Sequence, residues 1–293
     1  MTASPDDGRV PGGPARTAPD RTISARTAPA QIATARTISA RTAPAPTATA
    51  RTAPDQIAPD VWHLPFPVGH VYLVRLADGG YAAVDSGVPG SAPVILDAVT
   101  RLGGRPDALR QIVLTHFHID HMGSAADLVA ATGARVLAGA ADAPYICGTA
   151  PEPPPALTPT ERPLLEKVLA GMTGVGTPPL KHVRVDVELH DGDVLDDWPE
   201  PAHVLHVPGH TPGSTAVHLP AAGVLFTGDP IGTGPDGRVV LGPFNVDRAQ
   251  AIASFRRLAA LPGVDTLCVP HGIPVRTGAA RALAAATPES DWL

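Results

Sequence analysis

Three histidines and an aspartate lie within six consecutive positions of the sequence and have the chemistry of a metal site. They are His116, His118, Asp120 and His121. Imidazole and carboxylate groups are the ligands that zinc and similar divalent metals prefer. The apolar run at residues 111–114 predicts a strand directly before the cluster, and a strand end can present such groups from a rigid scaffold. An isolated histidine is more often structural, but the cluster favours a bound metal.

Three further candidate ligands occur later in the chain, each after an apolar, strand-like run. They are His210, Asp229 and His271, and each has Gly or Pro neighbours that suit sharp turns at strand ends. Any one of them alone would be interpreted as an ordinary loop residue. Their shared position at a strand exit favours a ligand role, and seven ligands are too many for one tetrahedral ion but suit two.

The order of these motifs resembles that of the metallo-β-lactamase superfamily of metal-dependent hydrolases. The motifs are His-x-His-x-Asp-His at 116–121, Gly-His-Thr-Pro-Gly-Ser at 209–214, Thr-Gly-Asp at 227–229 and His-Gly at 271–272. Ala-Val-Asp-Ser-Gly at 83–87 also matches the family's first strand-end motif. The resemblance covers residues 61–286 and is specific for the superfamily but weak for the substrate. It implies an α/β (α+β) fold, a four-layer αββα sandwich of two mixed sheets with helices outside.

The resemblance also implies how the seven residues divide between two metal ions. His116, His118 and His210 would hold the first ion, Asp120, His121 and His271 the second, and Asp229 would bridge them. The ions would be divalent, zinc foremost with iron or manganese as alternatives. Because a metal-bound water can have a pKa of about 7, a bridging hydroxide would attack a substrate carbonyl.

Two aspartates have expected roles beside the metals. Asp120 is the candidate catalytic residue, since it would also orient the nucleophile and pass its proton to the leaving group. Asp85 is the candidate to accept a hydrogen bond from a ligand imidazole, although it could instead cap the turn at Gly87. The remaining histidines are interpreted as structural or surface residues: His63, His70, His182, His190, His203, His206 and His218.

Composition limits the class of protein and its partners. The formal net charge of -6 argues against nucleic acid as a partner. No run approaches membrane-spanning length and no segment resembles a secretory signal, so we expect a cytoplasmic protein with no membrane partner. Cys147 and Cys268 are too few for a disulfide framework, and no Gly-x-Ser-x-Gly motif indicates a serine hydrolase.

The chain divides into a repetitive tail and one domain. Residues 16–55 repeat Arg-Thr-Ala-Pro-like units with a period of five, which matches neither helix nor strand. We expect residues 1–60 to be a disordered low-complexity tail rather than a pentapeptide solenoid, because the repeats lack large apolar groups. Residues 61–293 are expected to form the hydrolase domain.

Periodicity predicts the elements of that domain. Strands are predicted at 71–76, 81–84, 111–114, 135–138, 183–187, 203–207, 215–219, 224–227 and 266–269, and helices at 91–102, 124–132, 163–171, 247–261 and 278–286. Residues 143–180, here named the cap segment, interrupt the pattern and are expected to cover the metals. Its apolar members are Tyr145, Ile146, Leu164, Leu165, Leu169 and Met172. The alternative is an exposed insertion that packs on itself.

Departures from family patterns narrow the expected reaction. The lactamases of this fold generally lack an aspartate at the position of Asp229, and the flavodiiron proteins carry a carboxylate at that of His118. Nucleases add a domain and basic surfaces, and hydroxyacylglutathione hydrolases add a C-terminal extension, whereas 22 residues follow His271 here. We therefore expect a hydrolase of small acyl esters, lactones or thioesters. The alternatives are a β-lactamase-like activity, a persulfide dioxygenase-like activity and a non-catalytic metal-binding module.

Overall fold

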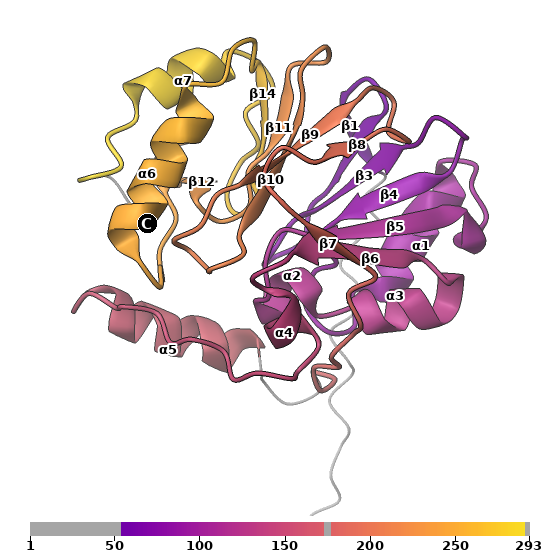
Figure 1. The fold of residues 1–293 in the computed structure, drawn as a ribbon, viewed down its shortest axis with the longest axis horizontal. Helices are drawn as coiled ribbons and strands as arrows, with labels where there is room; N and C mark the ends of the chain where they lie inside the picture. The colour runs from indigo at the N-terminus through magenta and orange to yellow at the C-terminus, as the bar shows by residue number, and fades with distance from the viewer. Residues whose placement is uncertain (1–53, 173–176, 291–293) are drawn as a thin grey trace, which may run out of the picture. The chain divides into compact units, whose positions relative to one another are not determined.

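Two β-sheets form the centre of the fold in the computed structural model, which describes residues 54–172 and 177–290 (Figure 1). The first sheet comprises β1 (Asp55–Ala58), β2 (Val61–Leu64), β3 (Val71–Arg75), β4 (Tyr81–Val84), β5 (Leu109–Leu114), β6 (Arg135–Gly139) and β7 (Val187–Leu189). The second comprises β8 (Val194–Leu195), β9 (Ala202–His206), β10 (Thr215–Leu219), β11 (Val224–Phe226) and β14 (Thr266–Cys268). The first sheet runs in the order β1 to β7, and the second in the order β14-β11-β10-β9-β8. A separate hairpin pairs β12 (Ile231–Thr233) with β13 (Val239–Leu241).

Helices cover the outer face of each sheet (Figure 1). Helices α1 (Ala92–Arg101) and α3 (Ala125–Thr132) lie on the first sheet, and α6 (Arg248–Ala259) and α7 (Ala279–Ala285) on the second. The shorter elements are η1 (Pro106–Ala108), α2 (Ile119–Met122) and α4 (Ala143–Ile146), and α5 (Glu161–Met172) belongs to the cap segment. Within the described residues, no helix combines the length and the apolar character needed to cross a membrane.

Three buried apolar clusters separate the four layers. Along β3, Leu73 faces the helices α1 and α3, whereas Tyr72 and Val74 face the second sheet, as the two-residue period of a strand requires. Val113 and Phe226 join Tyr72 between the sheets. The third cluster packs α6 and α7 against the second sheet. This arrangement is the αββα sandwich that the sequence predicted.

Most predicted elements agree with the structure to within two or three residues at each end. The clearest exception is the strand predicted at 183–187, because β7 begins only at Val187. Val183 and Val185 have strand-like alternation, but their side chains pack against the first core cluster from a loop. The backbone N–H of Val183 donates to Ile146 O rather than to a strand.

The first sheet begins before the expected start of the domain. β1 lies within the range 1–60 that was assigned to the tail, and it pairs antiparallel with β2, with Gln56 opposite Trp62. The pairing requires only one buried apolar residue, Ile57, because the edge of β2 supplies the hydrogen bonds. Residues 1–53 lie outside the described residues, so the expected disorder of the tail stays a prediction.

The strand directions bring the candidate ligands to one edge of the sandwich. β4 and β5 are parallel, as are β11 and β14. β9 and β11 are each antiparallel to β10 and therefore run in the same direction as each other. The segments that follow β5, β9, β11 and β14 carry all seven candidate ligands.

Candidate metal centre

Tight turns at the strand ends aim the candidate ligands inward. Gly209, directly before His210, has φ of +125°, a value that side chains disfavour, and a Cβ there would collide with the backbone of Ala251. A Cβ on Gly242 would likewise collide with the carbonyl oxygen of Asp229. The glycines therefore allow the ligand loops to pack against neighbouring backbone.

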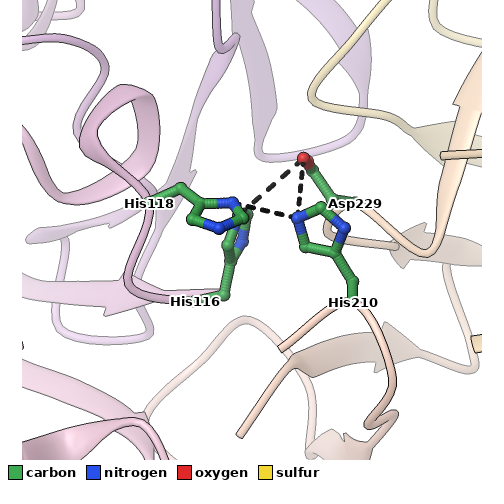
Figure 2. A group of neighbouring side chains, drawn as sticks. All are labelled: His116, His118, His210 and Asp229. Carbon is green, nitrogen blue, oxygen red and sulfur yellow. Dashed lines mark hydrogen bonds and ion pairs between the residues drawn. The ribbon is translucent and has the colours of Figure 1, made fainter. Parts of the chain in front are cut away.

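The first group of ligands consists of His116, His118, His210 and Asp229, which point toward a common centre (Figure 2). His118 Nδ1 lies 3.0 Å from His116 Nε2 and 3.0 Å from His210 Nε2. Asp229 Oδ2 lies 3.3 Å from His210 Nε2 and 3.8 Å from His116 Nε2. Four ligand atoms this close, from three loops, have the composition of a tetrahedral metal site.

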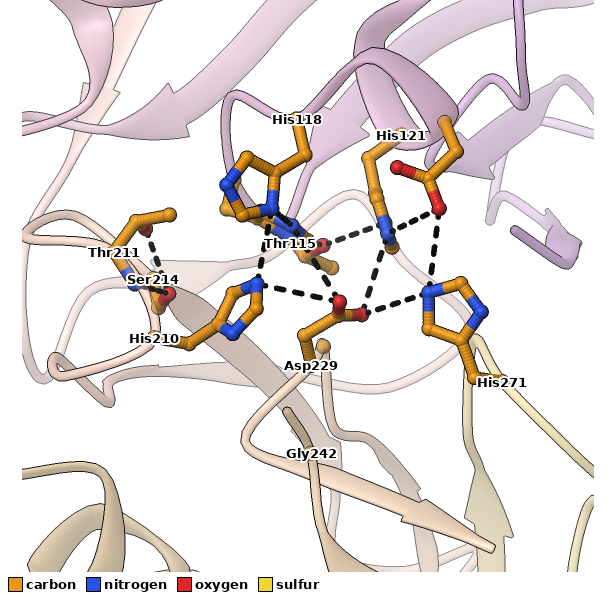
Figure 3. Close-up of polar contacts among 12 residues, drawn as sticks. Thr115, His118, His121, His210, Thr211, Ser214, Asp229, Gly242 and His271 are labelled. Atoms are coloured by element: carbon orange, nitrogen blue, oxygen red, sulfur yellow. Dashed lines mark hydrogen bonds and ion pairs between the residues drawn. The ribbon is translucent and has the colours of Figure 1, made fainter. Parts of the chain in front are cut away.

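The second group consists of Asp120, His121 and His271. His271 Nε2 lies 3.3 Å from Asp120 Oδ2, and His121 Nε2 lies 3.6 Å from the same oxygen. Asp229 Oδ1 lies 3.3 Å from His121 Nε2 and 3.4 Å from His271 Nε2, so Asp229 stands between His210 and His271 (Figure 3). One carboxylate therefore presents a separate oxygen to each group. The structure brings together all seven residues that the sequence singled out.

The electrostatics of the cluster favour a cation. Burial lowers the pKa of His121, but Asp229, Asp120 and Asp85 outweigh burial and raise it to about 10. Burial, with His210 as the next cause, lowers the pKa of His118 to about 3. The first group therefore presents a neutral imidazole at neutral pH, whereas the position of His121 attracts positive charge.

Two buried polar atoms at the centre fit a metal ion. His121 Nε2 and Asp229 Oδ1 have no hydrogen-bond partner within residues 54–172 and 177–290. Buried polar atoms without partners are uncommon in native proteins and need an explanation. Both atoms face the centre of the cluster, and nitrogen and oxygen donors of this kind suit zinc. The residues present thus fit a bound divalent metal, and the number of ions stays a prediction.

Contacts behind the ligands fix their orientation. Asp85 Oδ2 lies 2.9 Å from His121 Nδ1, and Asp85 also accepts hydrogen bonds from Thr115 N and Thr115 Oγ1. The role considered for Asp85 beside a ligand imidazole is thus the one that its geometry supports. Its φ of +63° is uncommon for a residue other than glycine.

Asp142, a buried carboxylate that holds a ligand loop, was not predicted from the sequence. Asp142 accepts hydrogen bonds from Thr211 Oγ1 and Gly213 N, both at 2.6 Å, and so ties down the loop that carries His210. Thr211 and Ser214 also bond to each other within this loop (Figure 3). Asp142 follows β6 by three residues, so the strand-exit pattern used for the ligands could have indicated it.

A pocket of about 980 Å³ opens over the candidate ligands. His118, Asp120, Asp229 and His271 line its floor. Helix α5 of the cap segment contributes Leu164, Leu165, Val168 and Leu169 to its walls, and the loop after β13 contributes Phe244. The other apolar residues of the cap segment differ. Ile146 is buried in the first core cluster and Tyr145 packs against that cluster, so neither lines the pocket, and the side chain of Met172 lies outside the described residues.

Comparison with known proteins identifies the family. A sequence profile of the metallo-beta-lactamase superfamily matches residues 64–271, more than half of the chain. The chain belongs to the metallo-β-lactamase superfamily. The superfamily and the αββα fold that the motifs predicted are therefore confirmed.

Several curated proteins of the superfamily are similar in sequence. The hydroxyacylglutathione hydrolase of Fuscovulum blasticum is 35% identical over 195 residues, which are 67% of this chain and 58% of that protein. The protein of the same name from Cereibacter sphaeroides (strain ATCC 17029 / ATH 2.4.9) is 34% identical over 223 residues, 76% of this chain and 68% of that protein. The probable metallo-hydrolase YflN of Bacillus subtilis (strain 168) is 28% identical, with 75% of this chain and 86% of that protein covered. The chain thus spans about three fifths of the length of the Fuscovulum protein.

Solved metallo-β-lactamase structures share the fold. A variant metallo-β-lactamase from Cronobacter sakazakii has a TM-score of 0.59 and 25% identity, with 80% of this chain and 93% of that chain covered. A metallo-β-lactamase family protein from Thermus thermophilus has a TM-score of 0.56 and 22% identity, with 78% of each chain covered. At this level of identity, the second likeness concerns the fold alone.

Proposed function

We propose that the chain is a metal-dependent hydrolase that holds two divalent ions and cleaves an ester, lactone or thioester. The observation that carries the proposal is Asp229, which presents Oδ2 to His210 and Oδ1 to His121 and His271 at the floor of the pocket. A carboxylate placed in this way suits a bridging ligand. Membership in a superfamily of metal-dependent hydrolases supports the enzyme class.

The ligand residues would divide as the two groups do. His116, His118 and His210 would hold one ion, Asp120, His121 and His271 the other, and Asp229 both. When bound, such ions lower the pKa of a water molecule and polarise a carbonyl oxygen, which makes hydrolysis feasible at neutral pH. Zinc is the ion that this nitrogen-rich set suits best, with iron and manganese as alternatives.

Asp120 is the residue that we propose to carry a proton. It lines the pocket, and only Oδ2 of its carboxylate faces His121 and His271 in the ion pairs of the cluster. A carboxylate at the pocket floor can orient the attacking group, accept its proton and deliver it to the leaving group. The apolar pocket walls would exclude water from the reacting bond.

The substrate class rests on the pocket and on the relatives. The walls are mainly apolar, which suits an acyl group or another hydrophobic portion of a small molecule. The relatives named hydroxyacylglutathione hydrolases support thioesters as candidate substrates. The fold is shared with β-lactamases, but a β-lactam substrate has no separate support from the site. A dioxygenase with a single metal would leave the group of Asp120, His121 and His271 without a role.

Metal analysis combined with a substrate panel tests the proposal. We expect two equivalents of metal per chain after separate reconstitution with zinc, iron and manganese, and hydrolysis of at least one ester, lactone or thioester. Asp229→Asn should lower both metal content and turnover. His190→Gln is the matched control, because His190 is exposed and pairs with Asp193 away from the site. One equivalent that added metal cannot raise would contradict the two-ion site, and inactivity of the fully loaded protein on all three classes would contradict the reaction.

A further inference from the structure

A buried glutamate joins the cap segment to a second segment that lines the pocket. Glu161, in the first turn of α5, is 2% exposed. Its Oε1 accepts a hydrogen bond from the backbone N–H of Phe244 at 3.2 Å, and Arg248 Nη1 lies 3.9 Å from the same oxygen. Phe244 lines the pocket. A carboxylate is rarely buried so fully without a specific partner, so this contact calls for a role.

Helix capping explains the contact of only one of the two carboxylate oxygens of Glu161. Oε2 accepts from Thr158 N at 2.8 Å, and Thr158 Oγ1 accepts from Glu161 N at 3.2 Å. These reciprocal bonds are a capping box, which stabilises the start of α5. Such a box needs one carboxylate oxygen. The other oxygen is directed to Phe244, which is 83 residues away in the sequence.

The segment around Phe244 is constrained from both sides. Phe244 has φ of +63°, a left-handed conformation that a bulky residue adopts rarely. Next to it, Asn245 O accepts from Ala156 N of the cap segment. Further along, Val246 N donates to His210 O and Asp247 N to Gly209 O. The wall that carries Phe244 is thus fastened to the cap segment at one end and to the loop of a candidate ligand at the other.

We propose that Glu161 is a positioning residue that fixes Phe244 against helix α5, and that Phe244 sets the size of the apolar group that the pocket accepts. The part of this inference that concerns substrate rests on the proposed function. Phe244 faces the same pocket as Leu164, Leu165 and Val168 of α5. Because Glu161 joins the two segments, the position of Phe244 relative to α5 is fixed, and an apolar group of the substrate is selected by how well it fits beside both.

Hydrogen exchange at the amide of Phe244 tests its contact with Glu161 without substrate or metal. Removing the acceptor in Glu161→Ala leaves the N–H of Phe244 without its partner, so its exchange rate should rise by about tenfold or more. Thr158→Ala is the matched control, because it weakens the capping box and leaves Oε1 in place. Glu166→Ala, which removes an exposed carboxylate from the same helix, controls for charge. If the amide of Phe244 exchanges at the parental rate in a folded Glu161→Ala protein, Glu161 does not position Phe244.

Trypsin gives a second readout of the cap segment. Between residues 148 and 180 the only basic residues are Arg162, which precedes Pro163 and resists trypsin, and Lys167. Cleavage after Lys167 therefore reports opening of α5. Cleavage should accelerate in Glu161→Ala and Thr158→Ala, because both weaken the start of the helix. Cleavage of Glu161→Ala at the parental rate would show that Glu161 does not hold the cap segment.

Selectivity tests the role of Phe244. Phe244→Gly removes the ring and suits the positive φ, so the fold should persist while the ratio of kcat/KM for bulky over small acyl substrates rises by about tenfold. Glu161→Ala should shift the same ratio in the same direction, and Thr158→Ala should not. If Thr158→Ala shifts this kcat/KM ratio equally, Glu161 acts only through capping of α5. If no acyl substrate is turned over, the proposed function fails. The exchange and trypsin results still decide whether Glu161 positions Phe244 against α5.

Discussion

The carboxylate of Asp85 accepts a hydrogen bond from Nδ1 of His121 over 2.9 Å, and the opposite nitrogen of the same imidazole faces Asp229. Because a carboxylate only accepts, this contact places the proton of the neutral ring on Nδ1 and leaves Nε2 for the candidate metal. The left-handed φ of Asp85, +63°, holds the carboxylate beneath the ring. A strained residue in this position indicates that orientation of His121 matters to the site.

Asp85→Asn should weaken metal binding without removing a ligand. Partners of this kind typically change metal affinity by about 10- to 100-fold. Competition with a chelator should show a loss of this size for one of two bound ions, with the other ion retained. Asp60→Asn is a suitable control, since Asp60 also has positive φ but lies in a partly exposed turn. If Asp85→Asn binds each ion as tightly as the parent protein does, the orienting role is ruled out.

Asp120→Asn should lower turnover more than it lowers binding at the first group of ligands. The change removes a candidate ligand of the second group and the proposed proton carrier together. Turnover should fall by at least on the order of 10²-fold, the usual scale for a positioned general acid or base. Turnover at full metal loading reports the loss of the proton carrier. Metal content at subsaturating metal reports the loss of the ligand. A variant that is loaded with metal and retains near-parental turnover would refute the proton-carrying role.

The sequence indicated the candidate ligands because their signal is local or repeated. His116 to His121 cluster within one loop, and His210, Asp229 and His271 each follow a strand, so pattern and chemistry agreed before any contact was known. Asp142 carried the same strand-exit signal but lacked a nearby partner in sequence. Its partners Thr211 and Gly213 are about 70 residues away, and only the packing of the two loops brings them together.

Fold prediction failed where backbone pairing, rather than side-chain pattern, decides the structure. The alternation of Val183 and Val185 is typical of a strand, yet these residues pack from a loop, and pairing with β6 begins at Val187. β1 has the opposite character, since its composition resembles the repeats and its hydrogen bonds come from the edge of β2. In the cap segment, apolar character alone could not distinguish core residues from pocket residues. Ile146 belongs to the core, whereas Leu165 lines the pocket.

Replacing Leu165 with a charged residue should reduce the dependence of hydrolysis on acyl length. Burial of each methylene contributes about 0.8 kcal/mol, so kcat/KM of the parent should rise several-fold per added carbon until the pocket is full. Leu165→Glu places a charge on the apolar wall and should flatten this rise while metal content stays unchanged. Lys181→Glu, which alters an exposed residue directly after the cap segment and outside the pocket, is the control. A parent protein with no length dependence would refute an acyl-binding pocket.

Two truncations separate the tail from the first sheet. Removal of residues 1–53 should leave stability and turnover near parental values, because the repeats lack apolar groups that could join a core. Removal of residues 1–60 also deletes β1 and the contact of Asp55 with Arg276, and it should lower the melting temperature. Thermal unfolding of both proteins beside the full chain checks the pair. A large loss of stability in the shorter deletion would show that the tail packs on the domain.

Asp142 should make stability depend on pH between about 4 and 6. Burial raises the pKa of Asp142 from 3.8 to about 6, although the hydrogen bonds from Thr211 and Gly213 oppose the shift. The folded state therefore binds this proton more tightly than the unfolded state does. The contribution of Asp142 to the free energy of unfolding is greatest below pH 4 and declines as the pH rises to about 6. A pKa difference of this size corresponds to about 3 kcal/mol.

Asp142→Asn should remove this dependence while it keeps an amide that can accept from Gly213 N and donate to Thr211 Oγ1. Urea unfolding of both proteins at several pH values, with a chelator present throughout, gives the difference in the free energy of unfolding. That difference should move in favour of Asp142→Asn as the pH rises from 4 to 6 and then level off. Asp193→Asn, which alters a partly exposed carboxylate, should show no such trend. A difference between Asp142→Asn and the parent that stays constant from pH 4 to pH 7 would mean that Asp142 ionises in the folded protein as it does in the unfolded chain.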